Sequence, residues 1–243
     1  MRNVKLTLQY DGTEFVGWQR QDQGASIQGT IEDALARIDG RTVTVHGAGR
    51  TDAGVHAEGQ VASAGVESVL DDDTMARALN ANLPETIRVT RVETVADEFH
   101  ARFSAVSKTY EYRIWNGPAQ PPFLRLYTWH VPQPLAIDIL QRGAAALVGT
   151  YDFASFQGAG TIVHTTVRTV MAAVWRPEAP LVFEITGEGF LRHMVRSLVG
   201  TLVEAGLRRR PVEDIGRLLA TPDRSGAGRT APPHGLFLTR VSY

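Results

Sequence analysis

The residues best suited to chemistry lie in one glycine-rich run, residues 49–59, with the sequence GRTDAGVHAEG. We expect this run to join two strands, at residues 42–45 and 60–63. Hairpin loops usually have roughly two to five residues, so this connection is unusually long. Its glycines would let the backbone approach a ligand closely. Its carboxylate, Asp52, could simply cap a turn, or it could act as a nucleophile or general base.

Two further clusters combine aromatic, amide and basic side chains. Residues 10–20 (YDGTEFVGWQR) could either pack in a hairpin or contact RNA. In residues 99–104 (FHARFS) and 108–110 (KTY), basic and aromatic residues alternate. A strand with this alternation would present a face of rings for stacking, with charged side chains at its margin. A plain amphipathic strand would explain the second cluster almost as well.

A third cluster is expected on a helix of about residues 190–205, where Arg192 and Arg196 would share one face. The helix is otherwise apolar, and an arginine on a mainly buried helix needs an anionic partner. Asp52 would be a suitable one. A fourth cluster, residues 229–236 (RTAPPHGL), is predicted to form an ordered loop before the last strand.

Several other chemistries lack the residues they need. His56 and Glu58 match one half of the zinc deaminase signature, but the other half needs cysteines and the chain has none. The absence of cysteine also excludes disulfides and thiolate chemistry. Asp52 occupies the third glycine position of a dinucleotide-binding fingerprint, and there is no G-x-S-x-G nucleophile elbow.

Composition indicates one large domain or two closely associated subdomains, because the chain has 243 residues and 43% hydrophobic content. The net charge of −1 argues against binding nucleic acid by bulk electrostatics but leaves room for a local basic groove. Lys5 and Lys108 are the only lysines, so arginine dominates the basic residues. Neither a signal peptide nor a bilayer-spanning run is recognisable, which favours a cytoplasmic protein.

The two halves of the chain have similar patterns of strand, helix, strand pair, helix and strand. In the first half we expect strands at residues 4–10, 42–45, 60–63 and 87–89, and helices from Ser26 as N-cap to residue 38 and at 72–81. In the second half we expect strands at 109–115, 169–175, 181–186 and 235–241, and helices at 137–147, 190–205 and 212–219. The pattern predicts an α+β fold: two split β-α-β halves share a largely antiparallel mixed sheet with helices on one face. The subdomains would be residues 1–104, carrying the Asp52 loop, and 105–243, completing the active-site cleft.

The motifs together resemble the tRNA pseudouridine synthases of the TruA type over nearly the whole chain. The strongest match is GRTDAGVHA at residues 49–57. Six others follow the family's order: residues 10–21, 79–84, 99–103, 108–112, 152–156 and 193–196. Residues 157–166 match no pattern of the family and receive no role.

The resemblance implies isomerisation of uridine to pseudouridine at positions 38, 39 and 40 of the tRNA anticodon stem-loop, without a cofactor or metal. Asp52 would be the nucleophile, attacking the sugar C1′ or the base C6, and a glycal route is a third version. Tyr110 would stack on the flipped base, and Arg196 would pair with Asp52. Arg50 would hold the flipped nucleotide, and Leu236 would line the pocket. The resemblance also implies a homodimer that grips tRNA across both subunits.

Two other functions remain as alternatives. A tRNA-binding or folding factor that has lost catalysis would be expected to lack at least one of Asp52, Arg50, Tyr110 and Arg196, and all four are present. An unrelated carboxylate-dependent enzyme acting on small molecules is the other alternative.

Overall fold

The chain divides by its internal contacts into two units in the computed structural model, which describes residues 1–160 and 163–243. The first unit contains Met1–Val106 and Phe237–Tyr243, and the second contains Ser107–Leu236. The boundary near residue 104 stays a prediction. The sequence pattern predicts the whole final strand in the second subdomain, but its residues from Phe237 onward belong to the first unit.

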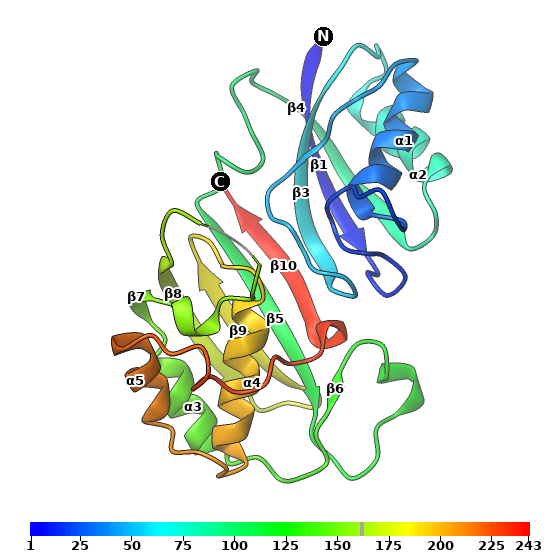
Figure 1. Ribbon diagram of the computed structural model, residues 1–243. Helices are drawn as coiled ribbons and strands as arrows, with labels where there is room; N and C mark the ends of the chain where they lie inside the picture. Colours follow the sequence, from blue (N-terminus) through cyan, green and yellow to red (C-terminus); the bar gives the residue numbers. More distant parts are fainter. Residues whose placement is uncertain (161–162) are drawn as a thin grey trace. The chain divides into compact units, whose positions relative to one another are not determined.

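The sheet of the first unit has the strand order β4-β1-β3-β10, with the short strand β2 also paired to β3. All pairs are antiparallel except β3 with β10, which run parallel. Helices α1 and α2 lie on one face of this sheet (Figure 1). The elements are β1 (Arg2–Tyr10), α1 (Ile27–Asp39), β2 (His46–Gly47), β3 (His56–Val66), α2 (Asp72–Asn82), β4 (Ile87–Val95) and β10 (Leu236–Ser242).

The core of this unit follows from the alternation of β1, whose Val4, Leu6 and Leu8 are fully buried. Helix α1 begins as predicted at Ser26, whose side chain accepts a hydrogen bond from the backbone N–H of Gly29 at 3.2 Å. It ends at Gly40, which takes the left-handed conformation common at helix C-termini.

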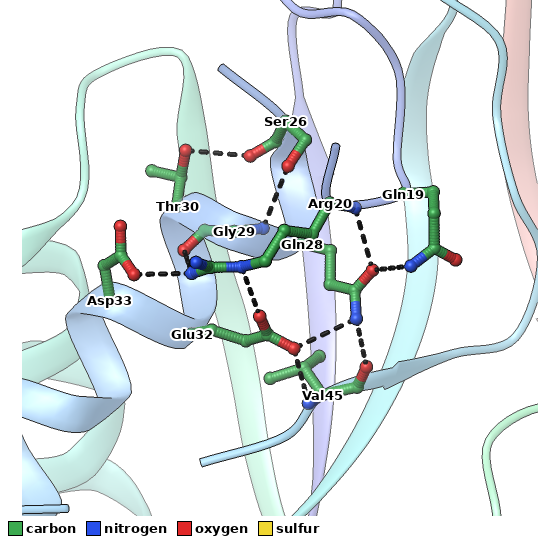
Figure 2. Close-up of polar contacts among 9 residues, drawn as sticks. All are labelled: Gln19, Arg20, Ser26, Gln28, Gly29, Thr30, Glu32, Asp33 and Val45. Atoms are coloured by element: carbon green, nitrogen blue, oxygen red, sulfur yellow. Dashed lines mark hydrogen bonds and ion pairs between the residues drawn. The ribbon is translucent and has the colours of Figure 1, made fainter. Parts of the chain in front are cut away.

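The prediction of a strand at residues 42–45 is wrong, because pairing with β3 begins only at His46 of β2. The two backbone polar groups of Val45 are instead bonded by side chains of α1. Gln28 Nε2 donates to the Val45 carbonyl at 3.1 Å, and the Val45 N–H donates to Glu32 Oε1 at 3.1 Å. Figure 2 shows Gln28 at the centre of this network, where it also accepts from the side chain of Gln19 and the backbone of Arg20.

The second unit has the strand order β5-β9-β8-β7, all antiparallel, with β6 parallel to β5. Its helices α3, α4 and α5 lie on the same face of the sheet (Figure 1). The elements are β5 (Ser107–Trp115), η1 (Pro122–Leu124), β6 (Trp129–His130), α3 (Ile137–Ala145), β7 (Gly149–Asp152), η2 (Ala154–Phe156), β8 (Val167–Arg176), β9 (Leu181–Gly187), α4 (Met194–Gly206), α5 (Asp214–Ala220) and η3 (Pro233–Gly235). The predicted α+β class with largely antiparallel sheets is confirmed.

Helix α4 begins at Met194, four residues later than the sequence predicted. The residue before it, His193, has φ 61°, a left-handed conformation that cannot continue a helix backward. Arg192 therefore lies outside the helix and does not share a face with Arg196, contrary to expectation. Its guanidinium donates to the Ala159 carbonyl at 3.1 Å.

Close packing against α4 gives a test of this part of the fold. A Cβ on Gly200 would lie 1.7 Å from the carbonyl oxygen of Arg229, so the loop before η3 can approach the helix only at a glycine. We expect Gly200→Ala to lower the free energy of unfolding by roughly 2–3 kcal/mol, from overpacking. Urea denaturation would measure the change.

The matched control is Gly216→Ala in α5, where a Cβ would meet no atom within 4 Å. Alanine there should raise stability by about 0.5–1 kcal/mol through helix propensity. Equal effects of the two substitutions would show that the contact between Gly200 and Arg229 does not restrict the helix.

Candidate functional site

Asp52 lies half-buried in the connection between β2 and β3, residues 48–55. The connection is shorter than expected because β3 already begins at His56, but it still exceeds a tight hairpin. The Val55 N–H donates to the Asp52 carbonyl at 3.1 Å, closing a turn that includes Gly54 at φ 75°. Arg50 lies on the same loop and is exposed.

A buried hydrogen-bond network underlies this loop. The hydroxyls of Tyr10 on β1 and Thr51 share a hydrogen bond of 2.9 Å. Gln60 on β3 donates through Nε2 to the Gly49 carbonyl at 2.8 Å and to the Tyr10 hydroxyl at 3.3 Å. Burial raises the pKa of Tyr10 to about 12, although its bonds to Thr51 and Gln60 oppose the shift. The phenol therefore stays protonated, and the residues on both sides of Arg50 are tied to the sheet.

The segment that follows β1 packs directly against the Asp52 loop. The Trp18 N–H donates to the Thr51 carbonyl at 3.0 Å. Gly17 has φ 107°, and a Cβ on it would lie 2.7 Å from the Thr51 carbonyl oxygen. Gly12 is similarly close, because its Cβ would lie 2.0 Å from the carbonyl oxygen of Val55. The two glycines are thus required for the loop to rest on this segment.

These contacts give part of residues 10–20 a packing role. Sequence reasoning left hairpin packing and RNA contact open, and the structure places Tyr10, Gly12 and Trp18 in the packing of the Asp52 loop. Arg20 forms ion pairs with Glu32 at 2.8 Å and Asp33 at 2.6 Å, which Figure 2 draws. The glycines in residues 10–20 indicated a close backbone approach in this segment, but only the fold shows that they approach the Asp52 loop.

Glycines flanking the loop also have internal packing roles. A Cβ on Gly47 would lie 2.4 Å from the ring of Trp18, and one on Gly59 would lie 2.2 Å from the Thr239 carbonyl oxygen. At Gly47 and Gly59 the absence of a side chain thus serves close packing within the protein, whereas the expectation from the sequence concerned only the approach of a ligand. Their small size serves the fit between neighbouring segments.

His56, at the end of the loop, is 1% exposed and fixed on several sides. Its Nδ1 accepts a hydrogen bond from the Gly12 N–H at 3.1 Å and lies 3.2 Å from Asp11 Oδ1. Its ring stacks on Phe237 of β10, with the centroids 4.7 Å apart. The histidine thus joins the loop to the segment that follows β1 and to the last strand, β10.

Tyr110 lies in the second unit, on β5 opposite Ile185 of β9. It is 7% exposed, and its ring meets that of Phe190 edge to face, with 5.2 Å between the centroids and 83° between the planes. Such an edge contact holds an aromatic ring in one orientation.

Arg196 lies in the first turn of α4 and is half-buried. Its Nε donates to the Ala231 carbonyl at 2.8 Å, and the Ala231 N–H donates to the Arg196 carbonyl at 3.0 Å. This reciprocal pair ties the helix to the predicted ordered loop, which ends in η3. Leu236 follows η3 and is buried.

The positive charge of Arg196 acts on two neighbouring groups. Burial raises the pKa of Tyr112, against the opposing charges of Arg196 and Arg229, and its hydroxyl donates to the Pro232 carbonyl at 2.7 Å. Burial lowers the pKa of His234; a hydrogen bond from its ring to the backbone of Thr128 opposes the shift, and the charge of Arg196 adds to it. Both side chains are therefore uncharged at neutral pH.

The five predicted site residues thus fall into two sets. Asp52 and Arg50 share one loop of the first unit, and Tyr110, Arg196 and Leu236 belong to the second. Residues 157–166 received no role from the sequence. In this segment the Gly158 N–H donates to the Arg192 carbonyl at 2.7 Å, whereas residues 161–162 lie outside the described part of the chain.

The part of the chain that the structure describes holds no group of three or more His, Asp or Glu side chains arranged for a metal ion. Within that part, no helix has the length and apolar character needed to cross a membrane.

Comparison with known proteins decides the family. A family model described as tRNA pseudouridine synthase matches residues 7–104 and 144–243. The chain belongs to the tRNA pseudouridine synthase family. The prediction of an RNA-modifying isomerase is thereby confirmed.

Individual relatives extend the match to the full chain. The tRNA pseudouridine synthase A 1 of Desulfotalea psychrophila is 42% identical, with 100% of both chains covered. The tRNA pseudouridine synthase A of Streptococcus sanguinis is 43% identical, covering 100% of this chain and 99% of that protein. A solved Cbf5-Nop10-Gar1 complex is 13% identical, with a TM-score of 0.38, covering 97% of this chain and 48% of that one.

The network beneath the Asp52 loop predicts a loss of stability in one substitution. Tyr10→Phe keeps the ring but removes the buried hydroxyl that bonds the side chains of Thr51 and Gln60, and Gln60 Nε2 keeps only its bond to the Gly49 carbonyl. We expect the free energy of unfolding to fall by about 1–3 kcal/mol. Thermal and urea denaturation would measure it.

Tyr151→Phe is the control, because Tyr151 is 39% exposed and water can satisfy its hydroxyl. Its effect should stay within about 0.5 kcal/mol. A Tyr10→Phe chain as stable as that control would contradict a structural role for the network.

Proposed function

We propose that this chain converts uridine to pseudouridine at positions 38, 39 and 40 of the tRNA anticodon stem-loop. The reaction breaks the C1′–N1 glycosidic bond, turns the base and rejoins it through C5. The proton displaced from C5 is balanced by one gained at N1, so the product is an isomer of the substrate. A base in a helical stem must first leave its stack, at a cost of a few kcal/mol.

We propose Asp52 as the nucleophile, and the observation that carries this role is the support of its loop. The carboxylate is half-buried, while Thr51 beside it and Gly49 nearby are bonded to Tyr10 and Gln60 of the sheet. Covalent catalysis requires a nucleophile held close to the orientation of attack. The sugar C1′ and the base C6 are the two points of attack that the role allows, and a glycal route is a third path.

The remaining roles follow the family resemblance. Tyr110 would stack on the flipped base, and stacking on an aromatic ring offsets roughly 1–3 kcal/mol of the cost of unstacking. Its edge contact with Phe190 supports this role, because a ring held in one orientation is a ready platform. Arg196 would keep the catalytic carboxylate ionised. Arg50 would hold the flipped nucleotide, and Leu236 would line the base pocket.

We further propose that the chain works in the cytoplasm as a homodimer that grips tRNA across both subunits. A net charge of −1 supplies little attraction for RNA as a whole. Binding would therefore depend on local basic surfaces, and a dimer doubles the surface that one tRNA can contact.

Replacement of the nucleophile tests the main proposal. We expect Asp52→Asn to fold and bind tRNA but to release no tritium from tRNA labelled at uridine C5, because an amide is a poor nucleophile. Filter binding and circular dichroism would serve as controls for binding and folding. Normal tritium release by Asp52→Asn would rule out Asp52 as the nucleophile. If the unaltered chain also released no tritium, a non-catalytic tRNA-binding factor would be favoured. Release from free nucleosides would instead favour an enzyme of small molecules.

Two substitutions of Tyr110 test stacking. Tyr110→Phe keeps the ring and should retain much of the activity, whereas Tyr110→Ala should lower kcat/KM by about tenfold or more. Single-turnover pseudouridine formation would measure both. Equal rates in the two variants would count against a stacking role.

A further inference from the structure

Four side chains form a stack at the surface of the first unit, here called the aromatic patch: the exposed His46, Arg102 and Phe103 and the half-buried His100. The ring of His100 lies between those of His46 and Phe103, with centroids 4.9 Å and 4.4 Å away. The guanidinium of Arg102 lies 5.6 Å from the centre of the Phe103 ring. Phe103 is 77% exposed, so one broad aromatic face is available to a ligand.

The aromatic patch lies on the face of the sheet that α1 and α2 leave uncovered. Ser63 of β3 pairs with Lys5 of β1, and both point to the face opposite that of the buried Leu6. The Ser63 hydroxyl accepts a hydrogen bond from the Ala101 N–H at 3.1 Å. Val61, two residues before Ser63 and on the same face, joins a buried cluster with Ala101. The segment after β4 therefore packs on the side of the sheet away from the helices.

The turn that carries the patch is anchored rather than loose. Asn3 donates through its side chain to the Phe99 carbonyl at 2.8 Å, and the Tyr243 hydroxyl donates to the Ala101 carbonyl at 2.9 Å. Within the turn, His100 Nδ1 accepts the Arg102 N–H at 3.1 Å. A ligand binding here would not have to pay for ordering the backbone.

A neutral His100 ring suits this stack. Burial lowers the pKa of His100, and the nearby charges of His46 and Arg102 lower it further against an opposing backbone hydrogen bond. The accepting Nδ1 agrees with an uncharged ring. The patch is thus a layered set of flat rings with one fixed positive charge at its exposed end.

We propose that the aromatic patch binds the tRNA substrate, with a nucleobase stacked on Phe103 and Arg102 paired to a neighbouring phosphate. Bases and phosphates alternate along RNA, and a stacking ring beside a guanidinium matches both. The patch is also continuous with the Asp52 loop, because His46 lies on β2, which leads directly into it. The patch and the Asp52 loop therefore belong to the same unit. The inference relies on the tRNA substrate and not on the role proposed for Asp52.

The test is affinity for an unmodified tRNA transcript in which cytidine replaces uridine at positions 38, 39 and 40, so that no turnover occurs. Phe103→Ala should weaken binding about tenfold, and Phe103→Trp should restore it because the ring face returns. Arg102→Gln should weaken binding and reduce the slope of log affinity against log salt by about one, as expected for one lost phosphate contact.

Matched controls lie in the same unit. Val69→Ala removes another exposed apolar side chain, at 98% exposure, and Arg77→Gln removes an exposed arginine of α2. Both should bind the transcript like the unaltered chain. Circular dichroism and sedimentation would be measured for every variant.

Unchanged affinity in Phe103→Ala and Arg102→Gln would overturn the proposal. So would a change in oligomeric state that accounts for the lost affinity, because the patch would then bind a second copy of the chain. Weaker binding by Phe103→Ala with an unchanged salt slope, and with recovery in Phe103→Trp, would support stacking. Because the transcript cannot react, these results are independent of whether Asp52 is the nucleophile.

Discussion

The buried hydrogen bonds among Tyr10, Thr51, Gln60 and Gly49 are the constraint on which the candidate site depends. A polar group buried without a partner costs about twice what a satisfied one contributes, so each member of this network restricts the others. Tyr10 comes from β1, Gln60 from β3, and the other two residues from the loop between β2 and β3. The position of the Asp52 loop is thereby linked to the register of the central strands.

That register contains an irregularity where the network forms. Leu8 pairs with Gln60, but Tyr10 pairs with Ala57, so one extra residue of β3 is accommodated between the two pairs. Bulges of this kind redirect side chains and often occur beside functional sites. Gly12 and Gly17 also support the Asp52 loop, because their backbones pack closely against the carbonyl groups of Val55 and Thr51. In the second unit, the reciprocal bonds between Arg196 and Ala231 hold α4 and its neighbouring loop in the same manner.

Most regular elements were predictable because their signals are local. Alternation predicted β1, and helical spacing with a serine N-cap predicted the start of α1. Predictions failed where a distant group replaces a local pattern. Residues 42–45 alternate like a strand, yet side chains of α1 satisfy the backbone of Val45. The apolar run at residues 190–205 looks helical throughout, yet the left-handed backbone of His193 delays α4 to Met194.

The sequence by itself determined the family and the residue proposed as nucleophile, because the motif around Asp52 and six others in order are a matter of residue types and spacing. It also determined the α+β class through hydrophobic periodicity. Only the tertiary structure decided that Tyr10, Gly12, Gly17 and Gln60 support the Asp52 loop, and that Arg102 and Phe103 stand exposed on an anchored turn. Those roles arise from contacts between residues far apart in the chain, and spacing along a sequence carries no information about which surfaces meet.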